Sequence, residues 1–202
     1  MPSIQDTAQR LPEWEISTWL NSSKPITIAA LRGRVVVVHS FQMLCPGCVT
    51  NGLPQAERVR QQFSASEVAV IGLHTVFEHH GAMTVEALQA FVFEYRWSFP
   101  IGVDMPGTSG SVPRTMERYG LQGTPSLIVL DRQGFIRFHQ FGHVDDLKLG
   151  ALIGNLLGEE HDGEVFSVER LAAMRGTAAG DCTADGCSIE PRRASPTKPA
   201  SR

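Results

Sequence analysis

The apolar residues of this chain fall into short uninterrupted runs, separated by longer stretches in which they recur at helical spacing. Val35–Val38 and Val68–Ile71 are rich in β-branched residues and lack polar alternation, which is typical of strands buried on both faces of a sheet. Leu127–Leu130 and Phe135–Phe138 flank a polar turn that ends at Gly134, so these residues predict a β-hairpin.

Further segments complete the predicted fold. Helices are predicted at residues 49–63, 84–95, 112–119 and 145–157. Thr84 is placed to cap the second helix, and acidic residues open the fourth. Residues 99–103 predict a short edge strand, because Pro100 has no N–H to donate to a second neighbour. Strands that alternate with helices and end in a hairpin imply an α/β fold, with a mixed sheet covered by helices on both faces.

The composition divides the chain into four parts. They are an N-terminal arm (1–23), a main domain (24–158), a short helical extension (159–175) and a tail (176–202). The arm carries Trp14 and Trp19, which are expected to cover the core of the main domain. The tail has one large aliphatic side chain, Ile189, so it buries too little apolar surface to offset chain entropy and is predicted to be flexible.

Charge and hydropathy narrow the function classes. The net charge of −3 and a pI of about 6.2 argue against a polyanion such as nucleic acid as the main partner. No apolar run approaches the roughly 20 residues that a membrane span requires, so no membrane partner is expected. The N-terminus lacks the basic start and apolar segment of a secretory signal, and a cytoplasmic location is therefore expected.

Two close pairs account for the four cysteines of the chain. Cys45-Pro-Gly-Cys48 follows a predicted buried strand and opens a predicted helix, where proline suits the first helical position. Free N–H groups at a helix start stabilise a thiolate by up to about 2 kcal/mol, and Cys48 is close enough to form a disulfide with Cys45. A zinc site would need two more ligands, but Cys182 and Cys187 lie far along the chain, so redox chemistry is favoured over a structural metal.

The chain resembles the thioredoxin-like redoxins, in their AhpC/TSA and TlpA-type branch, over about residues 24–157. Four motifs carry the resemblance: Leu31-Arg-Gly-Arg34, Cys45-Pro-Gly-Cys48, Tyr119-Gly-Leu-Gln-Gly-Thr-Pro125 and Asp131-Arg-Gln-Gly134. The resemblance implies a thioredoxin fold in which Pro125 is a cis-proline against the cysteines. It also implies that Thr124 offers its backbone to an extended disulfide substrate.

Three positions depart from the family pattern. Leu44 stands where TlpA-type members usually carry tryptophan. Gln42 and Val38 stand where peroxiredoxins carry threonine and proline. Because Gln42 and Val38 differ from the peroxiredoxin residues, disulfide exchange is favoured over peroxide reduction as the function.

Histidines form the second group of candidate residues. His39 lies six residues before Cys45, at the place where thioredoxins hold a buried acid that handles the proton of the second cysteine. An imidazole suits that role near neutral pH, and the alternative is a core histidine bonded to backbone. The segment His74–His80 holds three histidines and Glu78, but it lacks the i,i+4 pairing of metal-binding helices. It is predicted to be a polar loop at the edge of the active site, with metal binding as the alternative.

Together these features predict a cytoplasmic thiol–disulfide oxidoreductase that needs no cofactor. Cys45 is expected to attack a disulfide of a protein or small thiol substrate, and Cys48 to resolve the mixed disulfide, with a thiol as electron donor. One alternative is a peroxiredoxin-like thiol peroxidase with antioxidant activity, in which Cys45 becomes a sulfenic acid that Cys48 resolves. Another is a soft-metal-binding module built from Cys45, Cys48 and a histidine.

Two interpretations remain for the second pair, Cys182 and Cys187. The pair is either a relay that passes electrons to or from Cys45–Cys48, or part of a spectator tail. The sequence also leaves open whether the chain forms a homodimer, in which a relay would serve the neighbouring chain.

Overall fold

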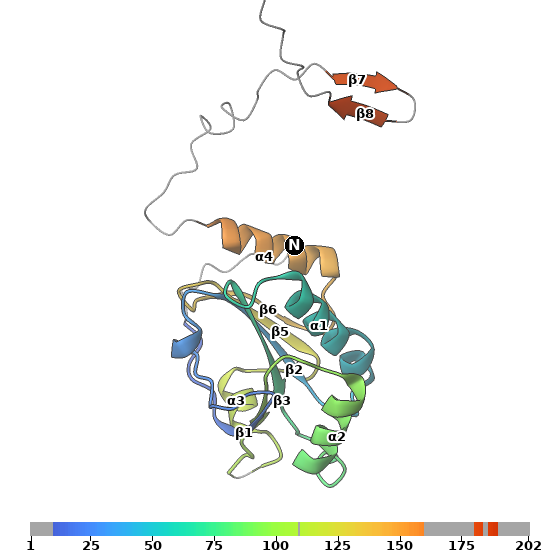
Figure 1. Ribbon diagram of the computed structural model, residues 1–202. Helices are drawn as coiled ribbons and strands as arrows, with labels where there is room; N and C mark the ends of the chain where they lie inside the picture. The colour runs from blue at the N-terminus through green and yellow to red at the C-terminus, as the bar shows by residue number, and fades with distance from the viewer. Residues whose placement is uncertain (1–9, 109, 160–179, 184–185, 190–202) are drawn as a thin grey trace, which may run out of the picture. The chain divides into compact units, whose positions relative to one another are not determined.

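A six-stranded mixed sheet organises the first of two structural units, which lie within residues 1–159 and 160–202 (Figure 1). The computed structural model describes residues 10–108, 110–159, 180–183 and 186–189. The strand order is β1-β4-β3-β2-β5-β6; β2, β3 and β4 are parallel, and β1, β5 and β6 each pair antiparallel with a neighbour. The strands are β1 (Ile16–Leu20), β2 (Val35–Phe41), β3 (Val68–His74), β4 (Ile101–Asp104), β5 (Ser126–Leu130) and β6 (Ile136–Phe141).

The two central strands are buried on both faces, as their sequences predict. All seven residues of β2 and all seven of β3 are buried. Val35 and Val37 pack in the core on one side of the sheet, and Val36 and Val38 pack in the core on the other side. Both strands run three residues beyond the apolar runs, so His39 also lies inside the sheet.

Helices cover both faces of the sheet, which confirms the predicted architecture (Figure 1). One face carries a π-helical turn (Cys48–Gly52), α1 (Leu53–Gln62), α2 (Val85–Tyr95) and α4 (Asp146–Gly158). The other face carries a 3₁₀ turn (Ala29–Leu31), α3 (Arg114–Arg118) and part of the N-terminal segment. No helix of the described residues is long and apolar enough to cross a membrane.

Two of the helices begin where their capping residues predict. Thr84 accepts a hydrogen bond from the Ala87 N–H through its hydroxyl oxygen. The Asp145 carboxylate accepts from the N–H groups of Leu147 and Lys148. Each cap satisfies backbone donors that the first helical turn leaves without a partner.

The strand predicted at 99–103 forms as β4, but its predicted place at the edge of the sheet is wrong, because the N-terminal arm supplies an additional strand. β1 pairs antiparallel with β4 and forms the edge of the sheet in its place. Pro100 precedes β4, and its carbonyl accepts from the Gly72 N–H at 2.9 Å, so its missing donor costs no pairing. A register shift between Ile16 and Thr18 interrupts the alternation that would have indicated β1 in the sequence.

Trp14 attaches the N-terminal segment to the sheet, as the sequence predicts. Its side chain is buried in the core that contains Val36 and Val38, and its indole N–H donates to the Ile26 carbonyl at 2.7 Å. Its ring meets Trp19 edge to face, with 5.6 Å between the ring centroids. The arm is therefore part of the main domain rather than an appendage to it.

The second unit contains a β-hairpin that the sequence does not predict. Its strands are β7 (Gly180–Thr183) and β8 (Gly186–Ile189), paired antiparallel, within the residues expected to form a flexible tail (176–202). The predicted helical extension lies outside the described residues, except for Glu159, whose N–H bonds to the Asn155 carbonyl at the end of α4.

We expect replacement of Trp14 by alanine to lower the free energy of unfolding by about 3–5 kcal/mol, because it leaves a cavity under the N-terminal segment. Chemical denaturation measures this change. Leu147→Ala is the control, since Leu147 is 82% exposed on α4, and its effect should stay within about 0.5 kcal/mol. Equal effects of the two variants would contradict the packing described here.

Candidate active site

Cys45 and Cys48 form a disulfide at the start of a helix. Their Cα atoms are 5.2 Å apart, and the helical segment begins at Pro46, the position that the sequence predicts. Cys45 acts as the cap, because the Cys48 N–H points at its sulfur with 3.2 Å between the nitrogen and Sγ. Once the disulfide is reduced, the same N–H stabilises a thiolate on Cys45.

Cys45 and Cys48 differ in their exposure to solvent. Cys48 is 0% exposed and belongs to the core beneath α1, whereas Cys45 is only partly buried at its rim. The Cys45 side chain is therefore the more accessible of the two.

Pro125 faces the disulfide from the neighbouring strand. The Thr124–Pro125 bond is cis, as the family resemblance implies. The Thr124 carbonyl oxygen lies 3.4 Å from the Cys45 Sγ. β5 begins directly after Pro125 and pairs antiparallel with β2, with Ser126 opposite Ser40. The loop that carries Cys45 and the loop that carries Thr124 therefore lie at the same end of these two adjacent strands.

Two glycines of the helical turn lie beside this proline. A Cβ at Gly47 would lie 3.4 Å from Pro125 Cδ, and a Cβ at Gly52 would lie 3.4 Å from Pro125 Cβ. The latter would also lie 3.7 Å from the His39 Nδ1 atom. His39, Pro125 and the turn that carries Cys48 are therefore packed together.

His39 is buried beneath this turn as a neutral imidazole. Burial lowers its pKa to about 4, and the nearby His143 adds to the effect. Its Nε2 atom has no hydrogen-bond partner among the described residues. A cavity of about 10 Å³ lies among His39, Gln55, Pro125 and His143, which is close to the smallest space that holds one water molecule.

The two segments that carry the disulfide and Pro125 have no charged residue, and large apolar side chains are exposed beside them. Leu44 and Phe141 are 57% and 52% exposed, although both are large hydrophobic residues. The Phe141 ring lies over Gly123, where a Cβ would be 2.9 Å from it. Neither the segment 41–53 nor the segment 120–130 contains a lysine, arginine, aspartate or glutamate.

Comparison with known proteins places this site in a family. The sequence model of the AhpC/TSA family matches residues 7–139. The chain belongs to the AhpC/TSA family. A thioredoxin-like superfamily protein of known crystal structure is 55% identical, and the match covers 76% of this chain and 99% of that one, with a TM-score of 0.74. A thiol-disulfide isomerase from Corynebacterium glutamicum is 50% identical over 77% of this chain and 99% of its own, with a TM-score of 0.73.

These likenesses confirm the thioredoxin-like fold that the sequence predicts for this AhpC/TSA family member. Protein DipZ of Mycobacterium bovis is also similar, with 29% identity over 154 residues. The match covers 73% of this chain and 20% of DipZ, so the chain spans about one fifth of the length of the curated relatives it matches. A disulfide-forming pair at the helix start of a thioredoxin-like fold places the chain among the thiol–disulfide oxidoreductase-like proteins.

The structure brings together five of the residues that the sequence singles out: His39, Cys45, Cys48, Thr124 and Pro125. The other two, Cys182 and Cys187, lie in the second unit. Each residue's chemical role stays a prediction.

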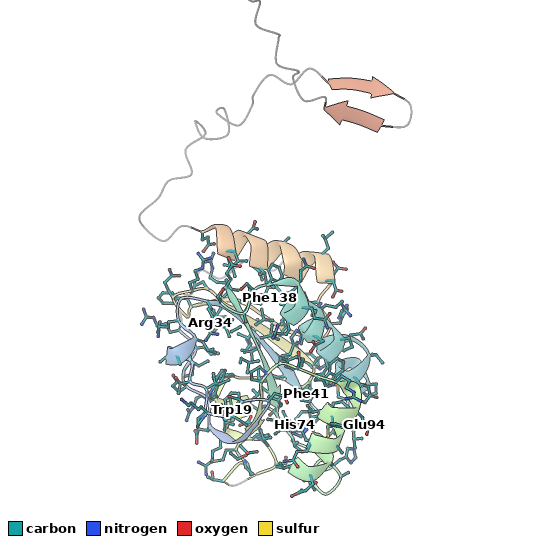
Figure 2. All side chains as sticks on the ribbon, in the orientation of Figure 1. Trp19, Arg34, Phe41, His74, Glu94 and Phe138 are labelled. Carbon is teal, nitrogen blue, oxygen red and sulfur yellow. A yellow bond between two sulfur atoms is a disulfide. The ribbon has the colours of Figure 1, made fainter. Side chains whose placement is uncertain are left out.

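His74 does not belong to the predicted polar loop, because it is the last residue of β3 and is buried. Burial lowers its pKa to about 4, and neither ring nitrogen has a partner among the described residues. Figure 2 shows it beside Phe41, with 5.1 Å between the ring centroids. The described residues contain no group of three His, Cys, Asp or Glu side chains that could hold a metal ion, so nothing here supports a metal site in this segment.

Two buried glutamines were not predicted to be part of the site. The Gln42 side chain accepts from the Phe77 N–H at 3.2 Å and donates to Glu78 at 3.4 Å, which ties the loop after β3 to the loop before Cys45. The Gln55 side chain donates to the Val144 carbonyl and to Asp146, each at 2.7 Å. All four bonds join segments far apart in the sequence, so local sequence patterns carry no signal for them.

Proposed function

We propose that this protein catalyses thiol–disulfide exchange, with Cys45 as the nucleophile and Cys48 as the resolving cysteine. The observation that carries the proposal is the position of the Cys45–Cys48 disulfide at a helix start beside Pro125. The difference in exposure between the two cysteines supports this order of action.

In the reducing direction the Cys45 thiolate attacks one sulfur of a substrate disulfide. A bond forms between this sulfur and Cys45, and the other substrate sulfur leaves as a thiolate. Cys48 then attacks the Cys45 sulfur, releases the remaining substrate thiolate and restores the Cys45–Cys48 disulfide. Two electrons have passed to the substrate, and a thiol donor reduces Cys45–Cys48 for the next cycle.

Disulfides in polypeptides suit this site better than small charged disulfides such as oxidised glutathione. The Thr124 backbone lies beside Cys45 at the rim of the sheet, where an extended chain could pair with it. Leu44 and Phe141 offer apolar surface to side chains that flank the substrate cysteine. The segments 41–53 and 120–130 offer no lysine or arginine to the carboxylates of glutathione.

His39 is proposed to receive the proton of Cys48 as that residue attacks. A neutral imidazole can accept a proton, and the negative charge that develops on the Cys48 sulfur favours its protonation at that moment. The small cavity that His39 shares with Gln55 and His143 has about the volume of one water molecule, which could exchange this proton with the imidazole.

The two alternatives receive less support. A thiol peroxidase would fit the family, but Gln42 occupies the position of the peroxiredoxin threonine, and its amide is bonded to the loop at Phe77 and Glu78. For a soft-metal module, the described residues contain no suitable cluster of ligands. The expected cytoplasmic location and the open question of a homodimer stay as the sequence leaves them.

We expect Cys45→Ser to abolish reduction of insulin disulfides by dithiothreitol, because no nucleophile remains at the surface. Cys48→Ser should instead accumulate a mixed disulfide between Cys45 and the substrate, visible by mass spectrometry. Turnover by Cys45→Ser, or a mixed disulfide on Cys48 in that variant, would contradict the assignment. Peroxide consumption by the reduced protein, at a rate equal to insulin reduction, would favour the peroxidase alternative.

Phe141→Ser should lower kcat/KM for insulin about fivefold, because docking would bury roughly half of a phenylalanine side chain, worth ~1 kcal/mol. Reduction of oxidised glutathione should not change. Phe93→Ser is the matched control, since Phe93 is 62% exposed on α2 outside the site. An equal loss with both substrates would show that Phe141 supports the fold of the site rather than the docking of polypeptides.

His39→Leu should slow the resolution step about 100-fold at pH 7, because Cys48 loses its proton acceptor. Its rate should then rise with pH up to about 9, while the wild-type rate changes less, because the His39 pKa of about 4 keeps the imidazole neutral above pH 5. Rapid-quench measurement of mixed-disulfide decay gives this profile. His74→Leu removes an equally buried histidine and should behave like the wild type; equal slowing in both variants would argue against the role of His39.

A further inference from the structure

The hairpin of the second unit places Cys182 and Cys187 directly opposite each other. β7 and β8 pair antiparallel with the register Gly180↔Ile189, Asp181↔Ser188, Cys182↔Cys187 and Thr183↔Gly186. Directly opposed residues of an antiparallel pair have Cα atoms about 4.5 or 5.5 Å apart, depending on the type of pair. Both spacings lie in the range of roughly 4.4–6.8 Å that a disulfide requires. A register shifted by one residue would have separated the two cysteines.

We propose that Cys182 and Cys187 form a second redox couple, which donates electrons to the disulfide of the first. This inference rests on the proposed function of Cys45–Cys48. It identifies the reductant of that couple as the hairpin couple of the same chain or of a second copy of it. The spectator-tail alternative requires no pairing of the two cysteines, whereas the register opposes them directly.

The exchange is balanced between the two couples. A thiolate of Cys182 or Cys187 attacks the Cys45 sulfur and forms a mixed disulfide, while Cys48 leaves as a thiolate and takes a proton. The second hairpin cysteine then attacks the hairpin sulfur of this bond, closes Cys182–Cys187 and releases Cys45 as a thiolate. Two electrons have moved to Cys45 and Cys48, and a thiol donor afterwards reduces the hairpin disulfide.

The surroundings of the two couples determine this direction. The Cys48 N–H at the helix start stabilises the Cys45 thiolate, which favours the reduced form of the first couple. The charged residues within four positions of Cys182 or Cys187 are Asp181, Asp185 and Glu190, all acidic, and Arg192 and Arg193 follow five and six positions after Cys187. Negative neighbours disfavour a thiolate, so the hairpin couple favours its disulfide and is the stronger reductant when reduced.

A redox titration of the full chain tests the order of the two couples. Trypsin releases Cys45 and Cys48 in one peptide (35–58) and Cys182 and Cys187 in another (176–192), so mass spectrometry reads each couple separately. In mixtures of reduced and oxidised dithiothreitol, we expect peptide 176–192 to become oxidised at a reduced-to-oxidised ratio at least about tenfold higher than peptide 35–58. A hairpin that stays reduced, or that titrates at an equal or lower ratio, would overturn the proposal.

A transfer experiment between two variants tests the exchange itself. The reduced double variant Cys45→Ser/Cys48→Ser, which keeps the hairpin couple, is mixed with Cys182→Ser/Cys187→Ser oxidised at Cys45–Cys48. We expect peptide 35–58 to gain two thiols as peptide 176–192 loses two. A donor that also carries Cys187→Ser is the control and should not close a hairpin disulfide. Absence of transfer would refute the relay.

An insulin-reduction assay distinguishes failure of the relay from failure of the proposed thiol–disulfide exchange at Cys45. Dithiothreitol reduces Cys45–Cys48 directly, so Cys182→Ser/Cys187→Ser should reduce insulin at the wild-type rate with this donor. If that variant is active but no transfer occurs, the relay fails and thiol–disulfide exchange at Cys45 stands. If the variant and the wild type are both inactive toward insulin, the proposed function itself fails.

Discussion

The antiparallel pairing of β2 with β5 is the constraint on which the site depends. Cys45 and Thr124 are 79 residues apart, and their closeness follows from the register that sets Ser40 opposite Ser126. Because β2 ends beside the start of β5, the loop that carries Cys45 and the loop that carries Pro125 lie at the same end of these two strands. Neither loop is a site alone: one supplies reactive sulfur, and the other supplies a backbone to which an extended substrate can align.

The same pairing of β2 with β5 contributes to the burial of Cys48. The helical turn after Cys45 packs against Pro125 and His39, with the glycines at 47 and 52 beside Pro125. Cys48 is thereby removed from solvent, where ionisation of its thiol is unfavourable unless a group nearby accepts the proton. The neutral imidazole of His39 under that turn, whose Nε2 has no partner among the described residues, is the group proposed to accept this proton.

Local sequence patterns predicted the parts of the fold that local physics determines. The valine run of β2, the cap at Thr84 and the proline after Cys45 each specify one element, and each was confirmed. The pattern failed where tertiary contacts decide. β1 was missed because a register shift breaks its alternation, and His74 was assigned to a loop because a polar residue at a strand end resembles a turn, although the core covers it. The cis bond before Pro125 followed from family resemblance, since no local pattern specifies it.

The two cysteine pairs show that backbone environment, as well as spacing, gives a pair its chemistry. Both pairs meet the distance requirement of a disulfide, one across a helix start and one across a hairpin. At the helix start, a free N–H points at sulfur and stabilises its anion. The charged residues nearest to the hairpin cysteines are acidic, and they oppose a thiolate there. In the proposed relay, electrons move from the hairpin pair to the pair whose thiolate the helix start stabilises.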